Sequence, residues 1–221
     1  MVLVRELITV NEVVKKGFFS RMAVPLMVLL FVAPMVAAWI VFNYFPDTVR
    51  SLGSSNYGEF IIPPAEISLD HYVDIDNQPL PADYFKKNWT YIYIHSQCDA
   101  ECFEHLLLIK NVRLTQGKEI SRLHRLLVLT SPTVDDTLRQ QLQNFPGMQV
   151  LVLKDEQQRE NFLQSFKFKG NPSPAAAGHV YVVDPDSKLM MYYKNQKKVL
   201  KLGKGMQKDM SKLMHNSQLR K

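Results

Sequence analysis

The chain has 221 residues, a formal net charge of +6 and two cysteines. This length accommodates one domain of ordinary size together with additional segments. Two cysteines form at most one intrachain disulfide, which excludes a disulfide-rich scaffold.

The most distinctive bulk feature is an uncharged run from Met22 to Phe45. At about 1.5 Å per residue, a helix of this length crosses a hydrocarbon core of ~30 Å. A cleavable signal peptide is the main alternative, but its apolar core is shorter, and this run continues past its small-residue "VAA" motif. We therefore predict a transmembrane anchor over residues 22–45.

Charges on either side of this run predict its orientation. Residues 1–21 are richer in basic side chains than the segment that follows the run, where Arg50 stands nearly alone. Because basic residues are retained in the cytoplasm, residues 1–21 are expected to be cytoplasmic and the large C-terminal part to be outside. That compartment permits disulfides. The N-terminal segment itself reads equally well as an amphipathic surface helix or as a frayed tail.

The remainder of the chain divides into a linker and one domain. Residues 46–64 contain "SLGSSNYG" and "PP", which are flexible and helix-breaking sequences. Residues 65–221 are long enough for one domain. Within it, hydrophobic periodicity and capping signals predict the following elements: a strand pair over Glu66–Leu80, strands over 89–96, 123–130 and 148–154, helices over about 99–116, 131–144 and 156–166, a hairpin from His179 to Lys194, and a last helix over 203–217.

This alternation of strands and helices predicts an α/β domain with helices on both faces of a sheet. The strand "WTYIYIHS" is apolar on both faces, as is typical of a central strand. A cysteine pair follows it, at the start of the next helix. The fold class expected is therefore thioredoxin-like, after a single N-terminal transmembrane helix.

Cys98 and Cys102 are the strongest candidates for chemistry. A helix N-terminus carries unpaired N–H groups and partial positive charge, which favour the reactive thiolate, whereas Asp99 and Glu101 oppose it. Residues at i and i+4 share a helix face, so both a disulfide and two metal-binding thiolates are possible. A purely stabilising disulfide is disfavoured because so short a loop removes little unfolded-state entropy. Buried inert thiols are the other alternative.

A copper or zinc site would need a third ligand, for which a histidine is the expected residue. His179 opens the strand "HVYVVDP", which is predicted to lie beside the cysteine-bearing strand. His95 and His105 flank the cysteines more closely in sequence. We rank His179 first, and each of the three also has an ordinary structural interpretation.

The C-terminal helix is expected to be amphipathic. Met206, Met210 and Met214 recur at helical spacing, with lysines on the opposite side. We predict that the methionine face packs on the sheet. The lysine face is either solvated or in contact with anionic lipid head groups or an acidic partner.

The anchor, the exported domain, the C-x-x-x-C pair and the downstream histidine together resemble the Sco/SenC proteins. The stretches "CDAECFEHLLLIKNVRLTQGKEISRLHRLLVL" and "HVYVVDPDSKLMMYY" are similar to small Sco-like membrane proteins encoded near bacterial cytochrome oxidase genes. Asp99 and Phe103 stand where the family usually has prolines. When the strand and turn around "VVDPDSK" are aligned, the family's ligand histidine falls near Ala176.

This resemblance implies an assembly factor for cytochrome c oxidase, with subunit II or other oxidase subunits as partners. It implies copper as the cofactor, held by Cys98, Cys102 and a histidine, with thiol–disulfide exchange at the cysteines. The expected location is the bacterial inner membrane, with the C-terminal domain in the periplasm, which excludes nucleic acid as a partner. The alternatives are a general membrane-tethered thiol–disulfide oxidoreductase without metal and a non-catalytic assembly scaffold.

Overall fold

The structure, a computed structural model, describes residues 2–45, 56–131, 134, 136–168, 171–196 and 199–218. Side chains are described from residue 22 to residue 217 within these ranges. The chain forms two compact units, Met1–Ser55 and Asn56–Lys221.

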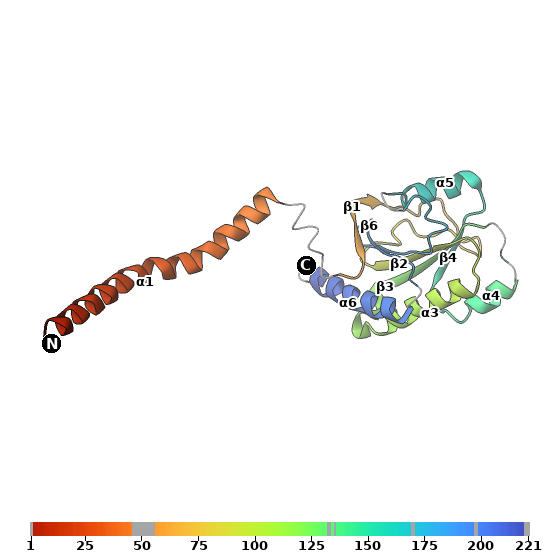
Figure 1. The fold of residues 1–221 in the computed structure, drawn as a ribbon. Helices are drawn as coiled ribbons and strands as arrows, with labels where there is room; N and C mark the ends of the chain where they lie inside the picture. The colour runs from red at the N-terminus through yellow and green to blue at the C-terminus, as the bar shows by residue number, and fades with distance from the viewer. Residues whose placement is uncertain are drawn as a thin grey trace. The chain divides into compact units, whose positions relative to one another are not determined.

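The described residues of the first unit form helix α1, Val2–Tyr44 (Figure 1). Its segment Met22–Tyr44 is long and apolar enough to cross a membrane, and Pro25 and Pro34 lie inside it. The prediction of an N-terminal apolar helix ahead of the domain is confirmed. The side chains of residues 1–21, which carry the basic residues used to predict orientation, lie outside the described ones.

The second unit is built on a mixed sheet of strand order β1-β6-β5-β2-β3-β4. Strands β2, β3 and β4 are parallel, whereas β5 pairs antiparallel with β2, and β6 and β1 continue antiparallel at that edge. The central strand β2 is buried along nearly its whole length, as its aromatic and β-branched residues predict. The bounds are β1 Glu59–Glu66, β2 Trp89–His95, β3 Leu123–Leu129, β4 Gln149–Val152, β5 Val180–Val183 and β6 Lys188–Tyr193.

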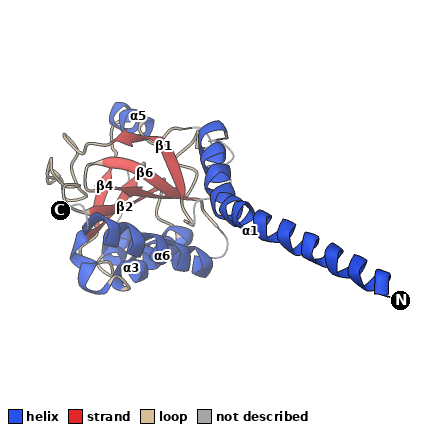
Figure 2. Ribbon diagram, turned by 90° about the vertical axis from the view of Figure 1, so that its left-hand side faces the viewer, coloured by secondary structure: helices blue, strands red, loops and turns tan. Residues whose placement is uncertain are grey.

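Helices cover both faces of this sheet. In Figure 1, α3 and α6 lie side by side on one face with α4 near them, and α5 lies on the other face; Figure 2 shows the same layering from the side. The bounds are α3 Ala100–Leu114, the 3-10 helix η1 Gly117–Arg122, α4 Asp136–Leu142, α5 Glu156–Gln164 and α6 Val199–Gln218. The predicted α/β, thioredoxin-like arrangement is confirmed.

Alternate residues of each strand enter two separate cores. The α3–α6 core contains Tyr91 and Tyr93 of β2, together with Cys102 and the methionines of α6. The α5 core contains Ile92 and Ile94 of β2, together with residues of α5. Met206, Met210 and Met214 are almost completely buried, so the expected docking of the methionine face of α6 is confirmed.

The N-terminal edge of the domain differs from the prediction. The strand pair predicted over Glu66–Leu80 is reduced to an antiparallel bridge between Val73 and Pro79 around a turn. Strand β1 occupies Glu59–Glu66, which overlaps the end of the predicted linker over 46–64. Pro63 and Pro64 lie in this strand, which is possible because β1 is an edge strand and proline is tolerated there. The region after β1 is irregular and is held by isolated bridges such as Val73 with Pro79.

Candidate redox site

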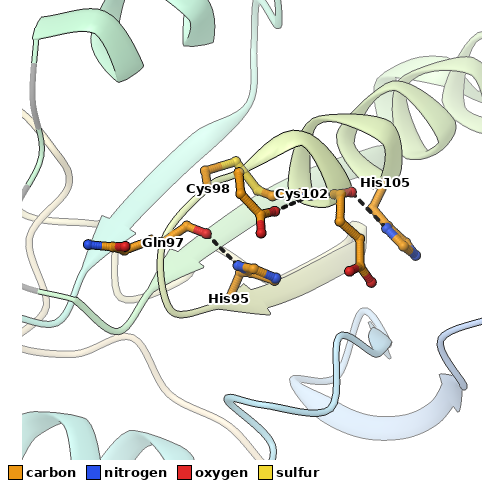
Figure 3. Close-up of a disulfide and its surroundings, with 7 residues drawn as sticks. His95, Gln97, Cys98, Cys102 and His105 are labelled. Carbon is orange, nitrogen blue, oxygen red and sulfur yellow. Dashed lines mark hydrogen bonds between the residues drawn. A yellow bond between two sulfur atoms is a disulfide. The ribbon is translucent and has the colours of Figure 1, made fainter.

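The two cysteines lie where the central strand turns into the first helix of the domain. Strand β2 ends at His95, and α3 begins at Ala100 with Asp99 as its N-cap. The Asp99 carboxylate accepts a hydrogen bond from the backbone N–H of Cys102 at 3.0 Å. This bond satisfies one of the N–H groups that a helix start leaves without an intrahelical partner. The short loop thus holds Cys98 immediately before the helix and Cys102 in its first turn (Figure 3).

Cys98 and Cys102 form a disulfide with a Cα–Cα distance of 5.0 Å. The two sulfurs have different environments. Cys102 has no exposed surface, whereas Cys98 is only partly buried and packs at the edge of the α3–α6 core. Because attack on a disulfide requires access, Cys98 is the accessible end of this bond and Cys102 the protected end.

His95 and His105 lie near the disulfide, and each ring is held by a backbone carbonyl. The Nδ1–H of His95 donates to the Gln97 carbonyl at 2.6 Å, and that of His105 donates to the Glu101 carbonyl at 3.0 Å. A carbonyl only accepts, so Nδ1 carries a proton in both rings. Figure 3 shows the His105 ring directed away from the two sulfurs. Among the described residues, neither histidine forms with the cysteines a group of three side chains that could hold a metal ion.

Tyr93 lies beside both of these histidines. Its ring stacks on His105 with a centroid distance of 5.2 Å and on His95 with 5.8 Å. Burial, together with the nearby charges of Glu101 and Asp99, raises the pKa of Tyr93, so its phenol stays neutral near pH 7. The alternation of side chains along β2 indicated that Tyr93 and His95 share a face of the sheet. The sequence did not predict that His105 of α3 would stack on the same ring.

The structure does not bring His179 to the cysteines. Its ring lies 5.4 Å from that of Tyr192 and 6.2 Å from that of Tyr181, measured between centroids. Both tyrosines belong to the α5 core, on the opposite side of the sheet from Cys102. The Nδ1 of His179 accepts the backbone N–H of Asn195 at 3.2 Å. Burial first, and the charge of Lys194 second, lower the pKa of His179.

A contact that sequence reasoning missed joins the site to the end of the sheet. The side-chain amide of Asn195 donates to the Glu101 carboxylate at 2.6 Å. Asn195 follows β6, and Glu101 lies in the first turn of α3, so one residue bonds both to the helix start and to His179. An isolated asparagine after a strand carries no sequence signal for such a role.

Within the described ranges, no three His, Cys, Asp or Glu side chains are grouped so that they could hold a metal ion. The cysteines are joined to each other, and the expected third ligand is bonded elsewhere. What the arrangement supports chemically is thiol–disulfide exchange at a helix N-terminus, where a thiolate released from the disulfide is stabilised by the helix dipole.

Comparison with known proteins agrees with this fold. The model of the transmembrane-like, thioredoxin-like C-terminal domain family matches residues 89–217. No curated protein sequence matches the chain significantly. The match covers more than half of the chain, including the cysteine pair and the hairpin.

Solved structures of Sco-type proteins share the fold at low sequence identity. Yeast Sco1, solved with copper bound, is 15% identical, with a TM-score of 0.50 over 73% of this chain and 95% of its own. Apo Sco1 of Thermus thermophilus is 15% identical, with a TM-score of 0.50 over 69% of this chain and 92% of its own. A SCO1/SenC family lipoprotein of Bacillus anthracis is 13% identical, with a TM-score of 0.50 over 66% of this chain and 96% of its own.

The expected structural resemblance to Sco/SenC proteins is thereby confirmed at the level of the fold. The family itself follows from the match to residues 89–217, which carries both the C-x-x-x-C helix and the terminal hairpin and helix. This chain belongs to the family of proteins with a transmembrane-like, thioredoxin-like C-terminal domain.

Proposed function

We propose that this protein is a membrane-anchored thiol–disulfide exchange factor that acts in the assembly of cytochrome c oxidase. The observation that carries the redox part is the disulfide between a partly exposed Cys98 and a fully buried Cys102 at a helix start. The oxidase part rests on the resemblance of the cysteine and hairpin segments to Sco/SenC proteins. The expected targets are the copper-site cysteines of subunit II.

The reaction begins with the reduced pair. The Cys98 thiolate attacks one sulfur of a target disulfide, whose other sulfur leaves as a thiolate and takes a proton from solvent. The Cys102 thiol loses its proton, and its sulfur attacks Cys98, which breaks the mixed disulfide and releases the second target thiolate. The bond Cys98–Cys102 forms, and two electrons pass to the target. A dithiol reductant, acting by the same exchange in reverse, returns the pair to its starting state.

The location proposed is the bacterial inner membrane, with the domain in the periplasm. The apolar helix segment Met22–Tyr44 supports the anchoring, and the excess of basic residues before it supports the orientation. A disulfide between Cys98 and Cys102 is compatible with that compartment.

Copper is the cofactor that the resemblance implies, and the described residues do not fit a three-ligand site for it. His179 accepts a hydrogen bond from the backbone of Asn195, and its ring packs against Tyr181 and Tyr192 of the α5 core. No step of the proposed reaction is therefore assigned to copper. His179 as a ligand of the reduced protein stays a prediction, and copper titration of the reduced protein, with Cys98→Ser, Cys102→Ser and His179→Ala variants, tests it.

Oxidase assembly in cells tests the proposed function against its alternatives. We expect that replacing both cysteines by serine abolishes the protein's contribution to oxidase activity, while the protein remains in the membrane at wild-type amounts. Full oxidase activity with both cysteines replaced would contradict the proposal and favour a non-catalytic scaffold. Equal reduction of unrelated disulfide substrates by the purified reduced protein would favour a general oxidoreductase.

A further inference from the structure

The outer face of helix α6 carries a row of positive charge. Lys201, Lys204 and Lys208 are all exposed, and their spacing places them on one side of the helix. We call these three residues the lysine stripe. At about 1.5 Å per residue it extends over roughly 10 Å of the helix.

No exposed acidic side chain of α6 neutralises this stripe. Asp209 is the only acidic residue in the sequence of the helix, and it is 1% exposed. Its carboxylate points inward and accepts the backbone N–H groups of Tyr57 and Gly58 at 2.8 and 2.9 Å. Leu200 directly precedes Lys201 and is 84% exposed, so an exposed apolar side chain lies at the end of the lysine stripe.

The same contacts fix where the chain enters the domain. Tyr57 and Gly58 are bonded to Asp209, and the Tyr57 ring lies so close to Gly205 that a Cβ placed there would meet it at 2.4 Å. The linker therefore joins the domain beside the middle of α6. In the sequence, residues 46–55 separate this point from the apolar segment. Because an extended chain spans at most about 3.5 Å per residue, this tether is no longer than roughly 35 Å.

We propose that the lysine stripe docks the domain on the anionic lipid surface of the membrane in which the chain is anchored. Anionic head groups attract basic side chains over about a Debye length, and the short tether keeps the stripe at a high effective concentration near them. Each lysine is expected to contribute about fivefold to the docking equilibrium. Leu200 would enter the head-group region beside the stripe, as apolar side chains of interfacial helices do.

Lysine footprinting on the full-length protein tests this proposal. The oxidised protein is placed in nanodiscs of neutral phosphatidylcholine, or of phosphatidylcholine with about a third phosphatidylglycerol, and acetylated briefly before mass spectrometry. Because three lysines act together, we expect the stripe lysines to react at least about fivefold more slowly on the anionic discs at low salt. This protection should disappear in about 0.5 M salt, because screening shortens the range of the interaction. Lys86, Lys167 and Lys188, which are exposed elsewhere on the domain, are internal controls whose rates do not change.

Matched variants separate the stripe from net charge. The triple change Lys201→Gln, Lys204→Gln and Lys208→Gln should leave Leu200 and the flanking segment equally open to hydrogen exchange on both kinds of disc. The triple change Lys86→Gln, Lys167→Gln and Lys188→Gln removes the same charge and should retain the protection of α6. Equal acetylation rates of the stripe lysines on neutral and anionic discs would overturn the proposal. That result would favour an acidic protein as the partner of the lysine stripe.

Discussion

The carboxylate of Asp99 lies 3.0 Å from the backbone nitrogen of Cys102 and caps the helix that carries the buried half of the disulfide. The same carboxylate is adjacent in sequence to Cys98, the accessible half. It therefore stabilises the helix start while its negative charge opposes ionisation of a neighbouring thiol. These two effects of one residue can be separated by substitution.

Replacement of Asp99 by asparagine should keep the cap and remove the charge. Since asparagine is as good an N-cap as aspartate, the free energy of unfolding should change little. The reduced protein should be alkylated faster at Cys98 near pH 7, because more of the thiol is ionised. Iodoacetamide labelling with mass spectrometry measures this rate.

Asp99→Ala is the matched control, because it removes both the cap and the charge. It should lower the free energy of unfolding by about 1 kcal/mol. Unchanged stability in Asp99→Ala would show that the hydrogen bond to Cys102 contributes little. Unchanged labelling in Asp99→Asn would show that the charge does not affect Cys98.

The buried carboxylate of Asp209 is expected to stabilise the domain. Asp209→Ala leaves the N–H groups of Tyr57 and Gly58 without their acceptor and should lower the free energy of unfolding by about 2–4 kcal/mol. Asp209→Asn retains a carbonyl oxygen at the same place and should cost less. Urea unfolding of the full-length protein in mild detergent compares the two. Equal losses would mean that the charge, rather than the accepted hydrogen bonds, makes the difference.

The lowered pKa of His179 makes the stability of the folded protein depend on pH. Burial lowers its pKa in the folded protein, so the unfolded state takes up its proton first as the pH falls through about 6.5. The wild-type protein therefore loses stability from about pH 7.5 downward, until the folded-state pKa is reached. His179→Gln should lose less stability over pH 7.5 to 5.5.

Thermal unfolding at several pH values measures this slope. A wild-type slope in His179→Gln would contradict the lowering of the His179 pKa by partial burial. The stability of His179→Gln should still fall somewhat as the pH falls, because His124 also contributes. Burial and the charge of Arg113 lower the pKa of His124 as well.

The sequence predicted the parts of the fold that local patterns determine. Strand β2 is apolar on both faces, and Asp99 is a cap signal directly ahead of an apolar helix, so the cysteines could be placed at a strand–helix junction. Strand β1 was not predicted, because its prolines argue against a strand unless the partner β6 and the edge position are known. Part of the predicted helix over 131–144 lies outside the described residues, and α4 occupies Asp136–Leu142.

The position of His179 relative to the cysteines was the hardest to predict from the sequence. Its position at the start of β5, beside β2, suggested proximity to the cysteines, but side chains alternate between the two faces of a strand. His179 shares its face with Tyr181, whereas Cys102 packs on the face of Val180. A shift of one residue would reverse this result, and sequence patterns do not determine register with that precision.

In the proposed reaction, Cys98 attacks the target disulfide and Cys102 resolves the mixed disulfide. To separate these roles, the reduced full-length Cys102→Ser and Cys98→Ser variants are mixed separately with an oxidised peptide that contains the copper-site cysteines of oxidase subunit II. We predict that Cys102→Ser accumulates a stable mixed disulfide through Cys98, that Cys98→Ser forms almost none, and that the reduced wild-type protein converts the peptide to its dithiol at one equivalent per chain. Equal trapping by both variants, or no reduction of the peptide by the wild type, would contradict this account.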